Sequence, residues 1–367
     1  MLSVLRAFDP TYKALKLIHT VYTIHNLALQ GVRPLAGDES ALLSWFPDLD
    51  YDAELLNDPR APHCINPMRA GINLSVRVHA VSPTYAREIQ LASNPEQGFF
   101  GGEGLQDDLQ RAAAEGRLHG ILNGCEYPGK TAPHLSASEL LLLCENELLR
   151  WIGNKPVVES AHLIASRRLA RMIPALGEPF IVTSVGRITD QKVLLLRQAM
   201  ANGETALHHL LQVLGDKGIF ILLGSGDAEL EQFLTGVAAV TENFVFLKGY
   251  SEAISQNLYS SGELFLMPSS FEPCGISQML AMRAGQPCLV HGVGGLRDTV
   301  RDGKDGFAFT GENLQNQAEN MIASFELALT IKRDKAKTWK KISVAAAAAR
   351  FLWSNAADEV VRLLYSN

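Results

Sequence analysis

The chain lacks long apolar runs and paired cysteine motifs. No stretch of its 367 residues reaches the ~20 consecutive apolar residues of a membrane span, so we expect no membrane-embedded segment. The opening residues, Met1–Arg6, carry no long apolar region with a small-residue cleavage site, which argues against a signal peptide. The five cysteines are scattered and form no C-x-x-C pair. This pattern argues against a zinc site and favours reduced thiols in the cytosol.

Strong positive charge is also missing. The formal net charge is −6, whereas non-specific nucleic-acid binding needs a basic surface, so we expect no nucleic-acid partner. A composition of 47% hydrophobic and 20% charged residues is that of a globular protein. A length of 367 residues exceeds one hydrophobic core and predicts two domains of ~150–200 residues.

The first third of the chain contains short segments typical of buried strands. Their apolar, β-branched and aromatic residues predict strands at Lys16–Ile24, Arg77–Val81 and Leu118–Leu122. Asn66–Leu74 has helical spacing. Ser82 and Pro83 predict a helix start, with the serine as N-cap and the proline in the first turn.

Strands and helices alternate from residue 179 to 310, which predicts a parallel sheet with helices on both faces. The predicted strands are Pro179–Val185, Ile219–Leu223, Phe244–Leu247, Glu263–Met267 and Pro287–Val290. The predicted helices include Lys192–Met200, Ser251–Tyr259, Arg297–Val300 and a terminal helix, Ala345–Ser366, broken near Trp353. The fold class is therefore α/β.

Two loops at predicted strand ends carry charged residues. Ser269–Ser277 holds one carboxylate, Glu272, and leads into a helix. Arg187 and Lys192 lie five residues apart across another strand-to-helix turn, where two cations beside a helix start suit a pyrophosphate. Ligands of α/β folds bind at the carboxyl ends of strands, so a ligand site is one interpretation. Ordinary solvated turns are the other.

Other motifs are weaker by themselves. Gly224 and Gly226 follow a strand but lack the third glycine of a dinucleotide fingerprint, so a tight turn explains them equally well. Gly294 and Gly295 permit close backbone approach to a ligand, or simply a sharp turn. Residues 124–131 fit the P-loop pattern, but Pro133 interrupts the helix that should follow, so we disfavour an NTPase.

Taken together, seven stretches resemble the bacterial glycogen synthases and plant starch synthases, glycosyltransferase family five. They run in family order over nearly the whole chain: Val21–Ala28, Ala80–Ala86, Gly102–Leu105, Gly120–Gly124, Gly186–Lys192, Pro268–Gly275 and Gly294–Val300. The resemblance implies the GT-B fold, with two Rossmann-like domains built on parallel sheets. Residues 1–124 plus 352–367 would form a partial acceptor-side domain, and residues 125–351 the nucleotide-sugar domain.

The resemblance also implies a reaction. Glucose would pass from ADP-glucose to the non-reducing end of an α-1,4-glucan, with retention at the anomeric carbon and without metal or cofactor. The implied location is the cytoplasm, or the plastid in a plant, and the oligomeric state stays open. The implied catalytic residues are His25, Arg187, Lys192 and Glu272. The implied substrate-binding residues are Asn26, Asn123, Gly224, Tyr250, Cys274, Gly275, Ser277, Gly294 and Gly295.

Within that resemblance the residues have separate roles. Arg187 and Lys192 would neutralise the departing diphosphate, and Glu272 would hold glucosyl hydroxyls. His25 and Asn123 would line the glucose pocket. Cys274–Ser277 would lie near the phosphates, and Tyr250 with Gly224 would border the nucleotide.

The chain also departs from the family pattern. The Lys-x-Gly-Gly loop that touches donor and acceptor is absent, so we expect an N-terminally truncated first domain with an exposed strand edge at Val21–Ile24. A histidine that follows Gly249-Tyr250 in well-known members is Ser251 here. A second hypothesis is therefore an impaired chain that binds nucleotide sugar or glucan, or needs a partner chain.

Overall fold

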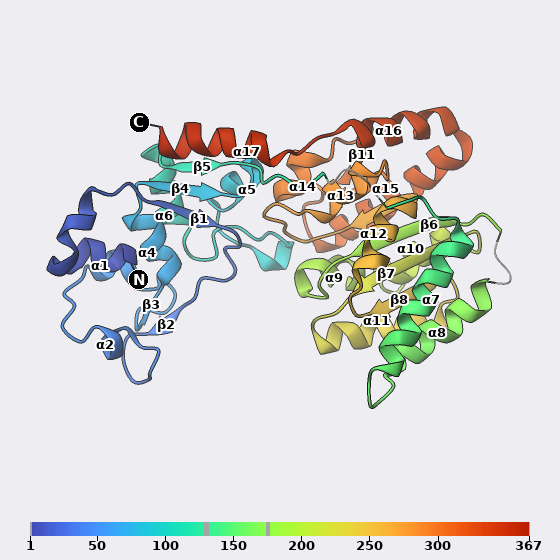
Figure 1. Cartoon of the computed structure of the whole chain (residues 1–367), viewed down its shortest axis with the longest axis horizontal. Coiled ribbons are helices and arrows are strands. Elements are labelled where there is room, and N and C mark those ends of the chain that lie inside the picture. The colour runs from blue at the N-terminus through green and yellow to red at the C-terminus, as the bar shows by residue number, and fades with distance from the viewer. Residues whose placement is uncertain (1, 128–131, 174–176, 367) are drawn as a thin grey trace. The chain divides into compact units, whose positions relative to one another are not determined.

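The computed structural model describes residues 2–127, 132–173 and 177–366. The chain divides into two compact units (Figure 1). Unit 1 comprises Met1–Gly124 with Leu352–Asn367, and unit 2 comprises Cys125–Phe351. Within the described residues, no helix is both long enough and apolar enough to cross a bilayer.

Unit 2 is built on a six-stranded parallel sheet with the order β11-β10-β9-β6-β7-β8. Its strands are β6 (Phe180–Val185), β7 (Gly218–Gly224), β8 (Phe244–Lys248), β9 (Leu264–Met267), β10 (Cys288–His291) and β11 (Gly306–Phe309). The chain builds outward from β6 to one edge, returns beside β6 as β9, and continues to the other edge. This doubly wound order puts a topological switch point between β6 and β9. The predicted parallel sheet is confirmed.

Helices cover both faces of this sheet because its strands are apolar on both sides. In β7, Phe220 and Leu222 pack on one face, while Ile219, Ile221 and Leu223 pack on the other. The first face carries α9 (Asp190–Arg197), α10 (Ala206–Leu214), α11 (Ala228–Val240) and α15 (Leu314–Asp334), with part of α16 (Ala336–Ala348). The second carries α7 (Ala137–Gly153), α8 (Ser160–Met172), α12 (Glu252–Ser261), α13 (Ser277–Arg283) and α14 (Gly294–Thr299).

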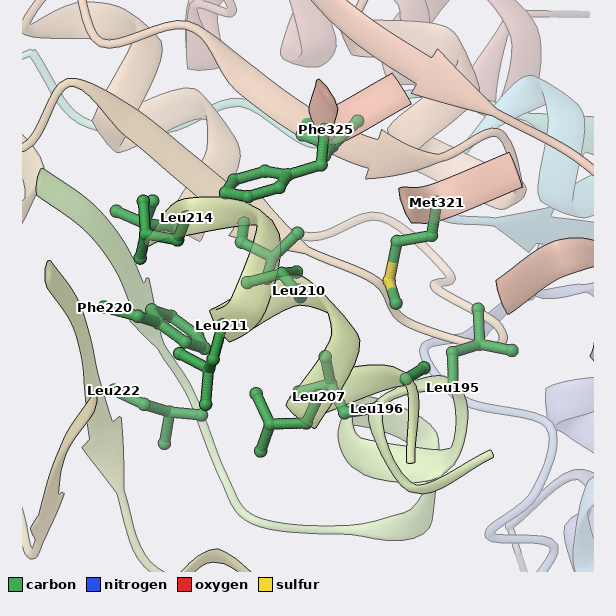
Figure 2. Close-up of a cluster of buried hydrophobic side chains, with 14 of the residues drawn as sticks. Leu195, Leu196, Leu207, Leu210, Leu211, Leu214, Phe220, Leu222, Met321 and Phe325 are labelled. Carbon is green, nitrogen blue, oxygen red and sulfur yellow. The ribbon is translucent and has the colours of Figure 1, made fainter. Parts of the chain in front are cut away.

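Figure 2 shows the core of the first face, where four leucines of α10 project between β7 and α15. They are Leu207, Leu210, Leu211 and Leu214. Burial of each such side chain contributes about 1.5–3 kcal/mol. Neither α10 nor α15 was predicted as a separate helix, although both contain apolar residues at helical spacing. The predicted helix Arg297–Val300 begins earlier, at Gly294.

Unit 1 holds a three-stranded parallel sheet with the order β1-β4-β5. Its strands are β1 (Val21–Ile24), β4 (Arg77–Ala80) and β5 (Leu118–Gly120), and a small antiparallel pair joins β2 (Arg33–Pro34) to β3 (Cys64–Ile65). The remaining elements before residue 124 are α1 (Leu2–Phe8), α2 (Leu42–Trp45), α3 (Ala53–Leu56), α4 (Pro67–Leu74), α5 (Pro83–Glu88), α6 (Gln106–Ala114) and the 3₁₀ turns Pro10–Leu17 and Pro95–Gln97. Among the described strands, β1 pairs with β4 alone.

Local capping explains several boundaries in unit 1. The prediction of a strand from Lys16 is wrong, because Asp9 caps the 3₁₀ turn Pro10–Leu17 by accepting from the Thr11 N–H at 2.8 Å. The predicted start of α5 is confirmed, since Ser82 Oγ accepts from the Tyr85 N–H at 3.3 Å.

The end of the chain contains two helices instead of one. α16 ends at Ala348, and α17 (Trp353–Val360) continues into a π turn, Val361–Tyr365, in unit 1. The predicted break near Trp353 is confirmed, but α16 begins nine residues before the predicted Ala345, at Ala336.

Candidate functional site

The switch point of unit 2 brings together three of the four expected catalytic residues. Arg187 follows the end of β6, Lys192 lies in the first turn of α9, and Glu272 lies in the loop after β9. Because β6 and β9 are neighbours in the sheet, these two loops leave the same sheet edge side by side. Crevices of this kind are where α/β sheets bind ligands.

Lys192 connects the two loops. Its ammonium donates to the carboxylate of Glu272 and, at 3.1 Å, to Ser269 Oγ. Both charged side chains are largely buried, with 23% of the lysine side chain and 10% of the glutamate side chain exposed. The pair is therefore only weakly screened by solvent.

Gln191, which no sequence pattern predicted as a site residue, reinforces the same connection. Its Nε2 donates to Phe271 O at 2.8 Å and to the Glu272 carboxylate at 3.4 Å. Its own carbonyl accepts from the Ser270 N–H at 2.8 Å. Gln191 thus fixes the backbone of the two residues before Glu272 as well as the Glu272 carboxylate, and these contacts preorganise the position of the glutamate.

Arg187 differs from Lys192 because its side chain is exposed and makes no ion pair with any residue that the structure describes. It lines a small hollow at the switch point together with Gly186, Lys192, Met267 and Pro268. The guanidinium is permanently charged and can bind a phosphate in a bidentate manner.

The glycines after β7 serve close backbone packing. A Cβ at Gly224 would lie 2.0 Å from Gly186 O, and one at Gly226 would lie 2.1 Å from Ile188 O. The backbone of Ile188 accordingly bonds to this loop on both sides, from its N–H to Ser225 O (3.0 Å) and from the Asp227 N–H to its carbonyl (2.8 Å). The loop Gly224–Gly226, which the resemblance places beside the nucleotide, is therefore hydrogen-bonded directly to the loop that carries Arg187.

The segment after Glu272 is fixed by α14. The Gly295 N–H donates to Glu272 O at 2.9 Å, and a Cβ on Gly295 would lie 2.2 Å from Cys274 O. Gly275 has φ +75°, a conformation that favours glycine, and the Gln278 amide donates to its carbonyl at 3.1 Å. Gly294 also has a positive φ, +43°.

Ser277 begins α13 and points back to the end of β6. Its hydroxyl donates to Val185 O at 3.3 Å and accepts from the Tyr259 hydroxyl at 3.1 Å. Burial raises the pKa of Tyr259 to about 12, so the phenol stays protonated as a donor.

His291 of β10, which no sequence pattern predicted as a site residue, supports the loop after β9 that carries Glu272. Its Nδ1–H donates to Ser269 O at 3.0 Å, and its ring stacks on Phe309. The side chain is 3% exposed, and burial lowers its pKa to about 4. The imidazole is therefore neutral in the folded protein at neutral pH.

Tyr250 follows β8 and is 69% exposed. Its neighbours are anchored: a Cβ on Gly249 would lie 2.9 Å from the Trp151 ring, and Ser251 Oγ donates to the Glu147 carboxylate at 2.9 Å. Ser251 also caps α12. Ser251, the position at which the resemblance leads one to expect a histidine, thus has a structural function.

Three expected residues belong to unit 1. His25 is exposed after β1, Asn26 Oδ1 accepts from the Ala28 N–H at 3.0 Å, and Asn123 follows β5. The loop after β1 is held by Tyr85, whose hydroxyl accepts from the Leu27 N–H at 2.8 Å. These residues gather at the carboxyl ends of the parallel strands of unit 1.

A buried histidine lies in β4, the middle strand of this sheet. His79 of β4 donates from Nε2 to Ile121 O at 3.3 Å. Its pKa is lowered chiefly by burial, and the neighbouring His25 adds to the shift. Across the part of the chain that the structure describes, no group of three or more His, Cys, Asp or Glu side chains is arranged to hold a metal ion.

The P-loop match is only partly described, because residues 128–131, including its Lys130, lie outside the described residues. At its start, Gly124 lies against the backbone of Trp353, where a Cβ would be 2.4 Å from the tryptophan nitrogen. This contact gives the glycine a packing role.

A hollow of about 670 Å³ lies at the opposite end of the unit 2 sheet, where the strands begin. Lys217, Asn243 and Glu242 line it, together with Met172 and Gly177. The last two flank residues 174–176, which the structure does not describe, so we place no site there.

Two family models match the chain. A starch synthase catalytic domain matches residues 1–111, and glycosyl transferases group 1 matches residues 179–326. Glycogen synthase of Desulfitobacterium hafniense is 32% identical over 363 residues, covering 95% of this chain and 67% of that protein. Glycogen synthase of Streptococcus sanguinis is 33% identical over 360 residues, covering 92% of this chain and 65% of that protein. The chain thus spans about two thirds of the length of these relatives.

Solved structures share the fold. The catalytic domain of starch synthase IV from Arabidopsis thaliana, bound to ADP and acarbose, has a TM-score of 0.69 and 24% identity, covering 99% of this chain and 69% of that one. Sucrose-phosphate synthase from Thermosynechococcus elongatus has a TM-score of 0.51 and 17% identity, covering 96% and 69%. The expected GT-B architecture is confirmed at the level of fold.

Proposed function

Because this chain belongs to the glycogen synthase family of glycosyltransferases, we propose that it transfers glucose from ADP-glucose to the non-reducing end of an α-1,4-glucan. The observation that carries the proposal is the switch-point cluster of unit 2, where Arg187, Lys192 and Glu272 occupy loops that leave β6 and β9 together. The proposed location is the cytoplasm, because the five scattered cysteines favour reduced thiols.

The two cations are suited to the leaving group. Breaking the glycosidic bond places growing negative charge on the departing diphosphate, and positioned cations stabilise such charge without reorganisation. Arg187 is exposed and makes no ion pair with a described residue, so it is available to a phosphate. Lys192 reaches the diphosphate by exchanging or sharing its contact with Glu272.

Glu272 is suited to the sugar. A carboxylate accepts hydrogen bonds from two hydroxyls at once, and this one is held in place by Lys192 and Gln191. The backbone at Cys274, Gly275 and Ser277 follows it directly, and with Gly294 and Gly295 it would lie along the phosphates. Gly224 and Tyr250 would border the nucleoside. For unit 1 the proposal is limited to hydrogen bonding of sugar hydroxyls by His25, Asn26 and Asn123.

The test is incorporation of labelled glucose from ADP-glucose into glycogen by this chain, in the presence of a chelator. We expect label in α-1,4 linkage, and we expect Glu272→Ala to abolish it. Label that survives Glu272→Ala unchanged would contradict the site, and activity that disappears with the chelator would contradict metal-free transfer.

A second candidate is a chain that binds nucleotide sugar or glucan without turnover, or that needs a partner chain. One observation favours it: Ser251 stands where well-known members of the family carry a histidine after the Gly-Tyr pair. Calorimetric titration with ADP separates the candidates, since binding of ADP without any incorporation supports the second and rejects the first.

A further inference from the structure

Glu231 is a buried carboxylate that the roles above leave unused. It lies in the first turn of α11, directly after the Gly224–Gly226 loop, and is 7% exposed. One carboxylate oxygen accepts from the Gly226 N–H at 2.7 Å, and the other pairs with Lys248 Nζ at 2.8 Å. A buried carboxylate with both oxygens engaged fixes the groups that it binds.

Lys248 extends this arrangement to the end of β8. It lies opposite Gly224 in the sheet register, and the next residue, Gly249, donates its N–H to Gly224 O at 3.1 Å. Its ammonium also pairs with Glu159 at 2.6 Å, and the two carboxylates raise the pKa of Lys248. Its carbonyl accepts from Nε2 of the buried His162 at 2.8 Å. The two segments proposed to border the nucleoside, at Gly224 and Tyr250, therefore share one buried support.

The support has a consequence for where the phosphates bind. The Gly226 N–H already donates to the Glu231 carboxylate. Glu231 and Glu159 share the cation Lys248, so this cation does not fully offset the Glu231 charge, which disfavours a phosphate beside Gly226. Ser225 and Gly226 are nevertheless exposed and available to an uncharged ligand surface. A phosphate is favoured instead at the hollow of the switch point, where Arg187 and Lys192 supply positive charge.

We propose that Glu231 is a positioning residue for the nucleoside, holding the Gly224–Gly226 backbone in the shape that contacts the uncharged part of the nucleotide. This inference rests on the proposed function of the same site. Glu231 acts through Gly226 and through Lys248 at the base of the Tyr250 segment, without touching the diphosphate.

Three variants of Glu231 separate the hydrogen bond from the charge. Glu231→Gln keeps an acceptor for the Gly226 N–H at the same reach and removes the charge and the ion pair with Lys248, whose ammonium Glu159 still holds. Glu231→Asp keeps the charge and withdraws the acceptor by one methylene, and Glu231→Ala removes both. Glu229→Gln is the matched control, because Glu229 lies in the same helical turn and is exposed.

Binding of ADP and of AMP is measured by calorimetry on the full chain, with Tm recorded for each variant. We expect Glu231→Ala and Glu231→Asp to weaken both nucleotides by a similar factor, about tenfold, and Glu231→Gln to stay within about threefold of wild type. Arg187→Gln should instead weaken ADP more than AMP. In the glucose-transfer assay the Glu231 variants should raise KM for ADP-glucose more than they lower kcat.

Two results overturn the proposal. If the Glu231 variants lower Tm but bind ADP like wild type, the residue is only structural. If Glu231→Gln is as weak as Glu231→Ala while Glu231→Asp binds normally, charge rather than loop position is the cause. Should Glu231→Ala fail to fold, the Asp and Gln variants still decide. Failure of wild type to bind ADP rejects the proposed function itself and is recognised before any variant is compared.

Discussion

The ammonium of Lys192 and the carboxylate of Glu272 form an ion pair across the switch point of unit 2, between the first turn of α9 and the loop after β9. In the proposed reaction these two groups serve different parts of the donor, the phosphates and the sugar. Their pairing keeps two partly buried charges satisfied before a ligand arrives. The polar groups of the site are therefore in place before a ligand binds, and a bound donor would replace part of the contact between Lys192 and Glu272.

The first prediction concerns the energy of this pair. Lys192→Met, Glu272→Gln and the double variant, unfolded by urea, should give a coupling free energy of about 1–2 kcal/mol, because each single change leaves a partly buried partner unpaired. The matched control is the exposed pair Arg197–Asp190, whose coupling should be no more than about 0.5 kcal/mol. Equal coupling in the two pairs would contradict the buried character of the first.

The second prediction concerns Arg187. Because its side chain is exposed and without an ion pair among the described residues, Arg187→Gln should change the free energy of unfolding by less than about 0.5 kcal/mol. The same change should lower kcat/KM for ADP-glucose by about 10²–10³-fold, since it removes a cation from the developing diphosphate charge. Arg197→Gln is the control, because Arg197 is likewise exposed but lies at the far end of α9. A loss of activity of less than threefold in Arg187→Gln would remove the arginine from the catalytic set.

The third prediction concerns Gly295. A Cβ there would lie 2.2 Å from Cys274 O, a backbone atom, so Gly295→Ala must displace the loop that carries Glu272. We expect a destabilisation of about 2–4 kcal/mol and loss of ADP-glucose turnover. Gly236→Ala is the control, because Gly236 lies in α11 with no atom within 4 Å of the added Cβ. It should stabilise the chain by about 0.5–1 kcal/mol, and thermal unfolding of both variants checks the two signs.

The fourth prediction concerns acid stability. Burial lowers the pKa of His291 from 6.5 to about 4. Between these values the unfolded chain binds a proton that the folded chain does not, so stability is present at neutral pH and is lost as pH falls through this window. The loss from this one group is about 3 kcal/mol by pH 4.

The measurement is urea unfolding from pH 7 to pH 4. His291→Asn keeps a donor toward Ser269 O and removes the titrating ring, so its pH dependence should be shallower than that of wild type. It should not vanish, because burial also lowers the pKa of His79. The exposed His134→Asn controls for the loss of one histidine. An unchanged slope in His291→Asn would exclude this residue as a source of acid sensitivity.

Much of unit 2 was predictable because each of its strands is a short apolar run ending at a loop of small or charged residues. β7 and β8 were predicted nearly to the residue, and the ends of β6 and β9 located Arg187 and Glu272. Helices α10 and α15 were missed because periodicity alone does not separate a buried helix from its flanking loops. The false strand start at Lys16 has a local cause: the Asp9 cap competes successfully with the β-branched residues that follow.

The candidate site was predictable only in part. Charged residues at strand ends carry a pattern that sequence reasoning can recognise. Gln191, Lys248 and His291 carry none, because their function depends on partners that are distant in sequence. Glu231 lies only five residues from Gly226, yet an acidic residue in a first helical turn is common enough to be overlooked.

The α/β class, the resemblance to glycosyltransferase family five and the identity of the charged loop residues follow from local composition and order, so they could be predicted before the fold was known. Three other findings required the folded chain: the bond from Lys192 to Glu272, the need for a glycine at position 295, and the support that Glu231 gives to the loop of Gly226. The first depends on the pairing of β6 with β9, although some 80 residues separate these strands along the chain. The second depends on the pairing of β9 with β10, and the link from Glu231 to Lys248 depends on the pairing of β7 with β8. Contacts of that kind are set by the packing of the whole sheet, and no local pattern encodes them.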